Sequence, residues 1–143
     1  MRYTGIDPGM KGAIAVLTSE DVLSLDDMPM VRGWYNPQAI RLILNAEEQT
    51  IGLEESFRFP KLCKGIGILW AIGELAPRSN LVMVLPVTWQ RFHGIQKADK
   101  NVSIDIARQL FPSEVKKLSL KMHHNRAEAL LIAEWVRRKI CHI

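Results

Sequence analysis

The chain has 143 residues and a mass of 16.3 kDa, which is the size of one domain. Apolar residues make up 48% of it and charged residues 24%, a globular balance that excludes a disordered or fibrous protein. No apolar run reaches the roughly 18 residues that a membrane-spanning helix needs. Two cysteines, Cys63 and Cys141, are too few for a disulfide framework or a zinc site. The first seven residues contain no apolar signal core, so we expect a cytoplasmic protein.

The charges divide unevenly along the chain. Residues 1–57 carry 4 basic and 9 acidic side chains, a net charge of −5, whereas residues 58–143 carry 15 and 6, a net charge of +9. This favours an acidic, metal-binding cluster beside a polyanion held by the other half, with chance clustering as the alternative. Nucleic acid fits better than a membrane surface, which would require an amphipathic helix.

Short strands are predicted first, at residues 2–7, 13–18 and 22–25. The turn at residues 8–12 joins the first two as antiparallel neighbours. Asn36 followed by Pro37 is a helix start, and the helix that begins there is predicted to end before Thr50.

Strands and helices then alternate. The predicted elements are a strand at 50–54, a helix at 61–76, a strand at 81–85 and helices at 101–111 and 125–139. Gly65, Gly67 and Gly73 weaken the helix at 61–76, so we expect a neighbour packed close against it. The order predicts a single domain over residues 1–143, a mixed sheet covered by helices of the α/β or α+β type. Trp70, Trp89 and Trp135 lie in apolar periodic segments and are expected in the core.

Three carboxylates stand at positions where ligands commonly bind. Asp7 and Glu54 end predicted strands, and ligands of open α/β sheets bind beyond the carboxyl ends of strands. Glu128 lies in the first turns of the last helix, on the same face as Asn125. Each residue alone is more typical of a structural role, such as a turn aspartate. Together the three carboxylates favour a site for a hard cation such as Mg²⁺.

Three motifs resemble the RuvC family of Holliday-junction resolvases, in particular its short bacteriophage forms. They are GIDPG at residues 5–9, LEESF at 53–57 and NRAEALLIA at 125–133, with PVTW at 86–89 between them. The resemblance spans nearly the whole chain and implies an α/β, ribonuclease-H-like fold with a mixed five-stranded sheet flanked by helices. For a phage-encoded protein the expected location is the host cytoplasm.

The resemblance implies a metal-dependent crossover-junction endodeoxyribonuclease. Such an enzyme resolves four-way DNA junctions by paired symmetric nicks, through two-metal-ion phosphodiester hydrolysis with two Mg²⁺ ions per site, or with Mn²⁺. It acts on branched DNA as a homodimer, because two symmetric nicks need two sites related by a two-fold axis. Two alternatives stay open: a catalytically weakened junction-binding protein, and another ribonuclease-H-like nuclease that acts on RNA.

The family's metal ligands are carried over onto matching positions. Asp7 matches the aspartate of the first strand, which bridges both metals. Glu54 matches the second-motif glutamate, because the pattern is a glutamate, two residues and a phenylalanine, which Phe57 completes. Glu55 is the alternative for this position. Glu128 matches the acidic residue of the last helix.

Asn125 departs from the family pattern, which has aspartate or sometimes histidine at this position. An amide offers one neutral oxygen, so it binds a metal ion more weakly than a carboxylate does. Three explanations stay open: His124 or His123 substitutes as a ligand, the natural enzyme is weak, or asparagine here is an inactivating substitution.

DNA contacts are expected after the second motif, where residues 57–61 interleave aromatic and basic side chains. The resemblance implies that Phe57 wedges into the opened junction centre, and a place in the core is the alternative for it. The predicted DNA-binding residues are Phe57, Arg58, Lys61, Lys64, Lys97, Lys100 and Lys121.

Overall fold

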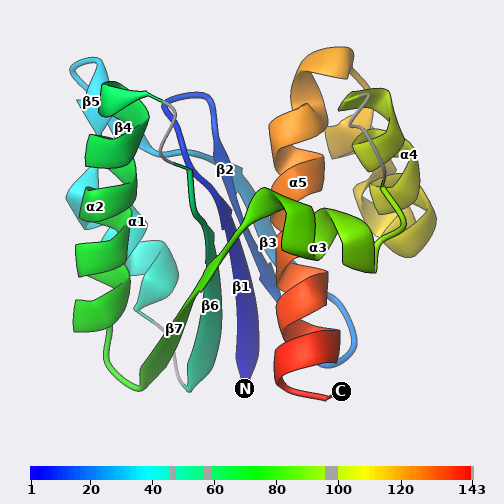
Figure 1. Cartoon of the computed structure of the whole chain (residues 1–143), viewed down its shortest axis with the longest axis horizontal. Helices are drawn as coiled ribbons and strands as arrows, with labels where there is room; N and C mark the ends of the chain where they lie inside the picture. The colour runs from blue at the N-terminus through cyan, green and yellow to red at the C-terminus, as the bar shows by residue number, and fades with distance from the viewer. Residues whose placement is uncertain (46–47, 57–58, 96–99, 143) are drawn as a thin grey trace.

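The computed structural model describes residues 1–45, 48–56, 59–95 and 100–142. A five-stranded mixed sheet with the strand order β3-β2-β1-β6-β7 forms its centre (Figure 1). Strands β1, β6 and β7 run parallel, and β2 pairs antiparallel with β1 and β3. The strands are β1 (Arg2–Asp7), β2 (Ala13–Leu17), β3 (Val22–Asp27), β6 (Gln49–Glu54) and β7 (Ser79–Val84). The predicted mixed five-stranded sheet is therefore confirmed.

Helices cover both faces of this sheet, which makes three layers (Figure 1). On one face lie α1 (Pro37–Leu44) and α2 (Pro60–Leu75), and on the other lie α3 (Pro86–Phe92), α4 (Lys100–Leu110) and α5 (His124–Trp135). Two 3₁₀ helices, η1 (Pro112–Leu118) and η2 (Lys121–His123), precede α5, and a π-helical turn, η3 (Val136–Ile140), follows it. Within the described ranges, no helix combines the length and apolar character that crossing a membrane requires.

The two faces of the sheet belong to two separate hydrophobic clusters. Tyr3 of β1 packs in the cluster that contains the buried residues of α5, whereas Ile6 packs in the cluster of α1 and α2. Because successive residues of a strand point to opposite faces, Gly5 and Asp7 share the face of Tyr3. The end of β1 therefore directs Asp7 toward the α5 side of the sheet.

Helix α5 approaches the sheet through two glycines. A Cβ atom on Gly5 would lie 2.1 Å from the carbonyl oxygen of Ala129 and 2.4 Å from the backbone nitrogen of Ala133. A Cβ atom on Gly52 of β6 would lie 2.6 Å from Cγ2 of Val136. Gly5 and Gly52 are paired neighbours in the parallel β1–β6 ladder. Together they let the helix lie against the strand backbones.

The glycines of α2 have different surroundings. A Cβ atom on Gly65 would lie 2.2 Å from the hydroxyl of Tyr35, and one on Gly73 would lie 3.2 Å from Leu81. Both positions confirm the expected close packing within the chain. Gly67 faces open space, since a Cβ atom there would meet no heavy atom of the described residues within 4 Å.

Several short elements of the fold are not among those predicted from the sequence. A small hairpin of β4 (Met30–Val31) and β5 (Trp34–Tyr35) precedes α1, α3 closely follows β7, and the 3₁₀ helices η1 and η2 precede α5. These elements are too short to show a hydrophobic period, and Pro86, which in the sequence indicates the end of a strand, begins α3. The last helix also differs from the prediction, because the α-helical part ends at Trp135 and a π-helical turn continues the chain.

Gly5→Ala is expected to destabilise the protein by about 3 kcal/mol or more. This is the upper end of the range for an added methyl group, because the atoms that it would meet belong to the backbone of α5 and cannot turn aside. The matched control is Gly67→Ala, at an exposed position of α2. It should stabilise the folded protein by about 0.5–1 kcal/mol, because alanine has a higher helix propensity than glycine. Urea unfolding of the two variants measures both values. A Gly5→Ala variant as stable as the original would contradict the close approach of α5.

Candidate active site

Asp7 is a buried carboxylate at the end of β1. Its exposed fraction is 5%, and its Oδ2 atom is buried without a hydrogen-bond partner among the described residues. Burial raises the pKa of Asp7 well above its usual value, the charges of Glu128 and Glu54 raise the pKa further, and the charge of Lys100 opposes them. An unpaired carboxylate in this environment is costly unless it is protonated or bound to a cation.

Glu54 lies at the end of β6, next in line to Asp7. The parallel register places Gly5 opposite Gly52 and Ile6 opposite Leu53, so Asp7 and Glu54 follow side by side. Two residues after Gly52, Glu54 also shares the α5 face. Burial raises the pKa of Glu54, and a hydrogen bond from Nε1 of Trp89 to Oε2 at 2.7 Å opposes that rise.

Glu128 completes the acidic group from the third element. It lies in the second turn of α5, one residue before Ala129, whose carbonyl oxygen touches Gly5. Burial raises the pKa of Glu128 to about 7, with a further contribution from the charge of Glu54 and an opposing one from Lys100. The structure thus brings Asp7, Glu54 and Glu128 within electrostatic reach of one another. We call these three residues the acidic group.

The first turn of α5 is tied to the strands below it. Nδ2 of Asn125 donates a hydrogen bond to the carbonyl oxygen of Lys11 at 2.5 Å, in the turn that follows Asp7. Arg126 binds both carboxylate oxygens of Asp27 at 2.7 and 2.8 Å, and its Nη1 donates to the carbonyl of Lys117. These contacts fix the rotation of α5 and thereby the direction of Glu128. An aspartate at position 125 could not donate this hydrogen bond, because its carboxylate has no N–H group.

The two histidines before Asn125 have different neighbours. His123 accepts a hydrogen bond from the backbone N–H of Leu120; burial and the charge of Arg126 lower its pKa, and the charge of Asp27 opposes them. Burial lowers the pKa of His124, and the charge of Lys100 lowers it too. Lys100 also acts on Asp7 and Glu128, so of the two histidines His124 is the one that shares a charged neighbour with the acidic group.

The chemistry of the acidic group suits a divalent metal ion. It offers carboxylate oxygens, which Mg²⁺ and Mn²⁺ prefer, and Oδ2 of Asp7 has no donating partner in the described part of the chain. As the side chains stand, no group of three or more His, Cys, Asp or Glu among the described residues is close enough to hold one ion.

A cavity of about 410 Å³ lies beside the start of α5. Its lining includes His123, His124, Asn125 and the turn residue Lys11, together with Asp27 of β3. The members of the acidic group do not line it. Asn125 is therefore the residue predicted for the metal site that lines this cavity together with His124.

The predicted DNA-binding residues are placed as follows. Phe57, Arg58 and Lys97 lie outside the described residues. Lys61 and Lys64 are exposed in the first turns of α2, shortly after the end of β6. The other two exposed lysines of this set are Lys100, which begins α4, and Lys121, in η2 just before α5.

The tryptophans divide between core and surface. Trp89 and Trp135 are 0% and 6% exposed, which confirms their predicted place in the core. The prediction for Trp70 is wrong, because its side chain is 48% exposed on the outer side of α2. Sequence reasoning missed the contact of Trp89 with Glu54, since a tryptophan in an apolar segment gives no sign that its N–H meets a carboxylate.

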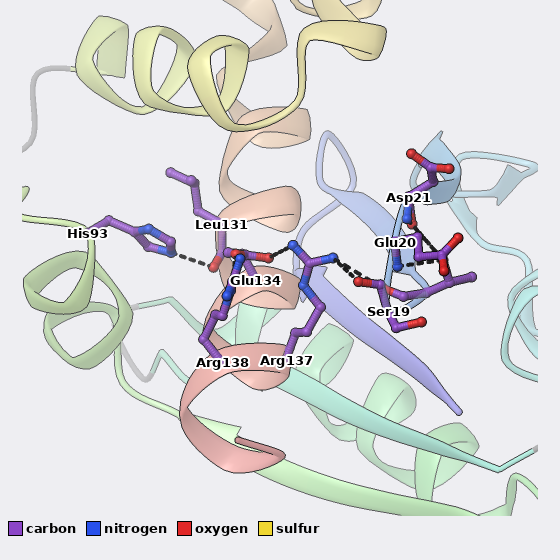
Figure 2. A network of polar contacts seen from close by, with 9 residues as sticks. Ser19, Glu20, Asp21, His93, Leu131, Glu134, Arg137 and Arg138 are labelled. Carbon is purple, nitrogen blue, oxygen red and sulfur yellow. Dashed lines mark hydrogen bonds and ion pairs between the residues drawn. The ribbon is translucent and has the colours of Figure 1, made fainter. Parts of the chain in front are cut away.

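A polar network holds the second half of α5 in place (Figure 2). The buried Glu134 binds Arg137 at 2.5 Å and Arg138 at 2.9 Å. Arg137 also donates to the carbonyl oxygens of Thr18 and Ser19, in the turn between β2 and β3. On the other side of the helix, Nε2 of His93 lies 2.7 Å from the carbonyl oxygen of Leu131 (Figure 2). These contacts anchor α5 both to the sheet and to the end of α3.

The raised pKa values of the acidic group predict a pH-dependent stability. Between the ordinary carboxyl pKa and about 7, the folded metal-free protein binds more protons than the unfolded chain. Its free energy of unfolding should therefore fall as the pH rises from about 5 to 8. At pH 8, Glu54→Gln should stabilise the metal-free protein by about 1 kcal/mol by removing one repelling charge. Urea unfolding across this pH range measures both effects.

The matched control is Glu55→Gln, which removes the same charge one residue further along. It should change the free energy of unfolding by less than about 0.5 kcal/mol, because Glu55 is half-buried and lies outside the acidic group. A larger gain from Glu55→Gln than from Glu54→Gln would move the assignment to Glu55.

Comparison with solved structures identifies the fold. The chain is similar to Thermus thermophilus RuvC, with a TM-score of 0.65 and 17% identity, over 96% of each chain. It is also similar to T. thermophilus RuvC in complex with a Holliday junction substrate, with a TM-score of 0.64 and 16% identity, over 97% of this chain and 96% of that one. Neither a family model nor a curated protein matches the sequence. The chain thus has the RuvC-like, ribonuclease-H-like fold that the motifs predicted.

Proposed function

We propose that this protein is a metal-dependent, structure-selective endonuclease that resolves four-way DNA junctions. The observation that carries the proposal is the acidic group: three buried carboxylates from β1, β6 and α5 lie on one face of a RuvC-like sheet, where the charges of Glu54 and Glu128 raise the pKa of Asp7 and that of Glu54 raises the pKa of Glu128. Buried, mutually repelling carboxylates are a typical arrangement for a cation-dependent active site. The similarity to a RuvC bound to a Holliday junction substrate supports the choice of substrate.

Each residue of the site has a separate task. Asp7, Glu54 and Glu128 would hold the divalent cations, and the amide oxygen of Asn125 would be the fourth oxygen ligand. Cations bound there supply Lewis-acid activation of water and stabilise the leaving oxygen of phosphodiester hydrolysis. The charge of Lys100 lowers the pKa of Asp7 and Glu128, so its ammonium group would be available to a phosphate bound beside the cations.

Exposed basic side chains lie near the starts of the helices that follow or carry the acidic group. Lys61 and Lys64 follow β6, Lys100 begins α4 and Lys121 precedes α5, all with exposed side chains. Such lysines bind phosphates without reading sequence. Binding through them requires no divalent ion and should weaken with salt.

We propose further that the active form is a homodimer. Two symmetric nicks on a junction need two active sites related by a two-fold axis, which a symmetric dimer supplies. The outer side of α2, with the open Gly67 and the half-exposed Trp70, is a surface on which a second copy could pack.

One observation favours a second function, junction binding without efficient cleavage. Asn125 replaces a charged ligand of the family, and its amide nitrogen is engaged with the carbonyl of Lys11. The fourth position of the metal site then contributes a neutral oxygen at most, which weakens cation binding.

The test is single-turnover cleavage of a labelled four-way junction with and without Mg²⁺. We expect Mg²⁺-dependent paired nicks from the original protein, and their loss in Asp7→Asn with junction binding retained. Asn125→Asp should cleave at least about tenfold faster, because a carboxylate strengthens cation binding. In the absence of metal the same variant should be less stable, since it loses the bond to Lys11 and adds a charge.

Three outcomes separate the alternatives. Junction binding without cleavage by the original protein, with cleavage by Asn125→Asp, would establish the binding function. Equal cleavage rates for both would mean that Asn125 is not a ligand and that His124 or water serves in its place. Cleavage of RNA in preference to the junction would establish the ribonuclease alternative.

Two substitutions are expected to separate stacking from phosphate contact. Phe57→Ala should reduce the preference for junctions over linear duplex, because stacking on an exposed base contributes about 1–3 kcal/mol, and should leave the salt dependence unchanged. Lys61→Ala should weaken both substrates and flatten the log–log salt slope by about 0.9 for one lost phosphate. Binding titrations at several salt concentrations measure both. If Phe57→Ala instead lowers the melting temperature strongly, Phe57 belongs to the core.

A further inference from the structure

Trp89 is the largest fully buried side chain among the described residues, and it carries a polar contact. It lies in α3 with an exposed fraction of 0%, in the cluster that also contains Leu130 of α5. Its Nε1–H donates a 2.7 Å hydrogen bond to Oε2 of Glu54. The indole is thus the direct neighbour of one carboxylate of the acidic group.

The contact constrains how Glu54 can turn. A hydrogen bond to a carboxylate is shorter and stronger than one between neutral groups, and an indole N–H can only donate. With Oε2 held, rotation of the carboxylate about its last bond is restricted, and Oε1 is the oxygen left for another partner. A glutamate side chain otherwise loses considerable rotamer entropy when it is fixed on a cation.

The donor itself is held rigidly from both ends of α3. Pro86 begins the helix shortly after β7, the strand that pairs with β6. At the other end, His93 contacts the carbonyl oxygen of Leu131 at 2.7 Å, about one turn beyond Glu128 on α5 (Figure 2). A carbonyl oxygen only accepts, so Nε2 of His93 carries the proton. Helix α3 therefore connects the element that bears Glu54 with the element that bears Glu128.

We propose that Trp89 is a positioning residue that holds the Glu54 carboxylate in the orientation in which it binds a divalent cation. The inference rests on the proposed function in that it takes Glu54 as a metal ligand. Partners that orient metal-binding side chains commonly contribute about 10–100-fold to metal affinity or activity. In this fold the partner is an indole N–H on a short helix that is itself fixed to α5.

The first test is direct binding of Mn²⁺ to the DNA-free protein, followed by the loss of the free Mn²⁺ signal in electron paramagnetic resonance. Trp89→Phe keeps an aromatic ring and removes the N–H, and we expect it to raise the Mn²⁺ dissociation constant about tenfold or more. Single-turnover cleavage should slow by a similar factor, while junction affinity without divalent ions stays unchanged. A purely structural role of Trp89 would not separate metal affinity from junction affinity in this way.

The matched control is Trp135→Phe. Trp135 is a buried indole of the same core cluster, near the opposite end of α5 from the acidic group, so its replacement removes the same atoms from the packing. We expect it to lower the melting temperature and to leave Mn²⁺ binding unchanged. Equal weakening of Mn²⁺ binding by both substitutions would attribute the effect to packing and overturn the inference, as would unchanged binding in Trp89→Phe.

A second measurement uses the original protein and does not depend on the folding of Trp89→Phe. The indole N–H of Trp89 gives one ¹H–¹⁵N resonance, and titration with Mg²⁺ alone should shift it because its acceptor becomes a ligand. Glu54→Gln keeps an oxygen acceptor and removes the charge, so the shift should disappear in that variant. A resonance that does not move at saturating Mg²⁺ would overturn the inference.

The outcomes also separate this inference from the proposed function. If the original protein binds Mn²⁺ and Trp89→Phe weakens that binding, but no junction is cleaved, Trp89 positions Glu54 and the nuclease function is wrong. If cleavage is metal-dependent and Trp89→Phe binds Mn²⁺ and cleaves like the original, the function stands and the inference fails. If the original protein binds no divalent ion, both fail.

Discussion

Helix α5 packs directly on the backbone of β1, and this contact determines where the candidate site can form. At Gly5 the helix backbone occupies the space that any side chain would need, and Gly52 gives the same access on β6. Since Glu128 lies one residue before the Ala129 carbonyl that touches Gly5, this approach brings its carboxylate to the ends of the two strands. A larger residue at Gly5 would push the helix outward and separate the three carboxylates.

The acidic group that results is unfavourable for the folded chain. Asp7 is buried with one oxygen that no described residue contacts by a hydrogen bond, and its pKa and that of Glu128 are raised by burial and by neighbouring like charges. A fold keeps such groups when a ligand compensates them, and stability is often lower at functional sites for this reason. Elsewhere α5 is held by paired charges, such as Glu134 with Arg137 and Arg126 with Asp27. The contrast between paired and unpaired charges on one helix distinguishes its structural face from its candidate catalytic face.

Helix α3 links the two sides of this site. Its Trp89 contacts the carboxylate at the end of β6, and His93, just after it, contacts the backbone of α5. Two elements of the candidate site that are far apart in the chain are therefore joined by a helix of seven residues. Coupling of this kind depends on rigid packing, which the fully buried indole provides.

Sequence patterns were enough to predict the mixed sheet, most helices and the residues of the acidic group. They were enough because strand ends, helix starts and the three motifs are local features of the sequence. They do not reveal the β4–β5 hairpin, the exposure of Trp70 or the bond between Trp89 and Glu54. From the sequence Asn125 is predicted only as a weak ligand, whereas in the folded chain its amide donates to the carbonyl of Lys11, 114 residues away. Such contacts arise in the packed fold, since which buried donor meets which acceptor depends on how closely distant segments approach. Periodicity specifies the face on which a side chain lies, and only the packed fold specifies its partner.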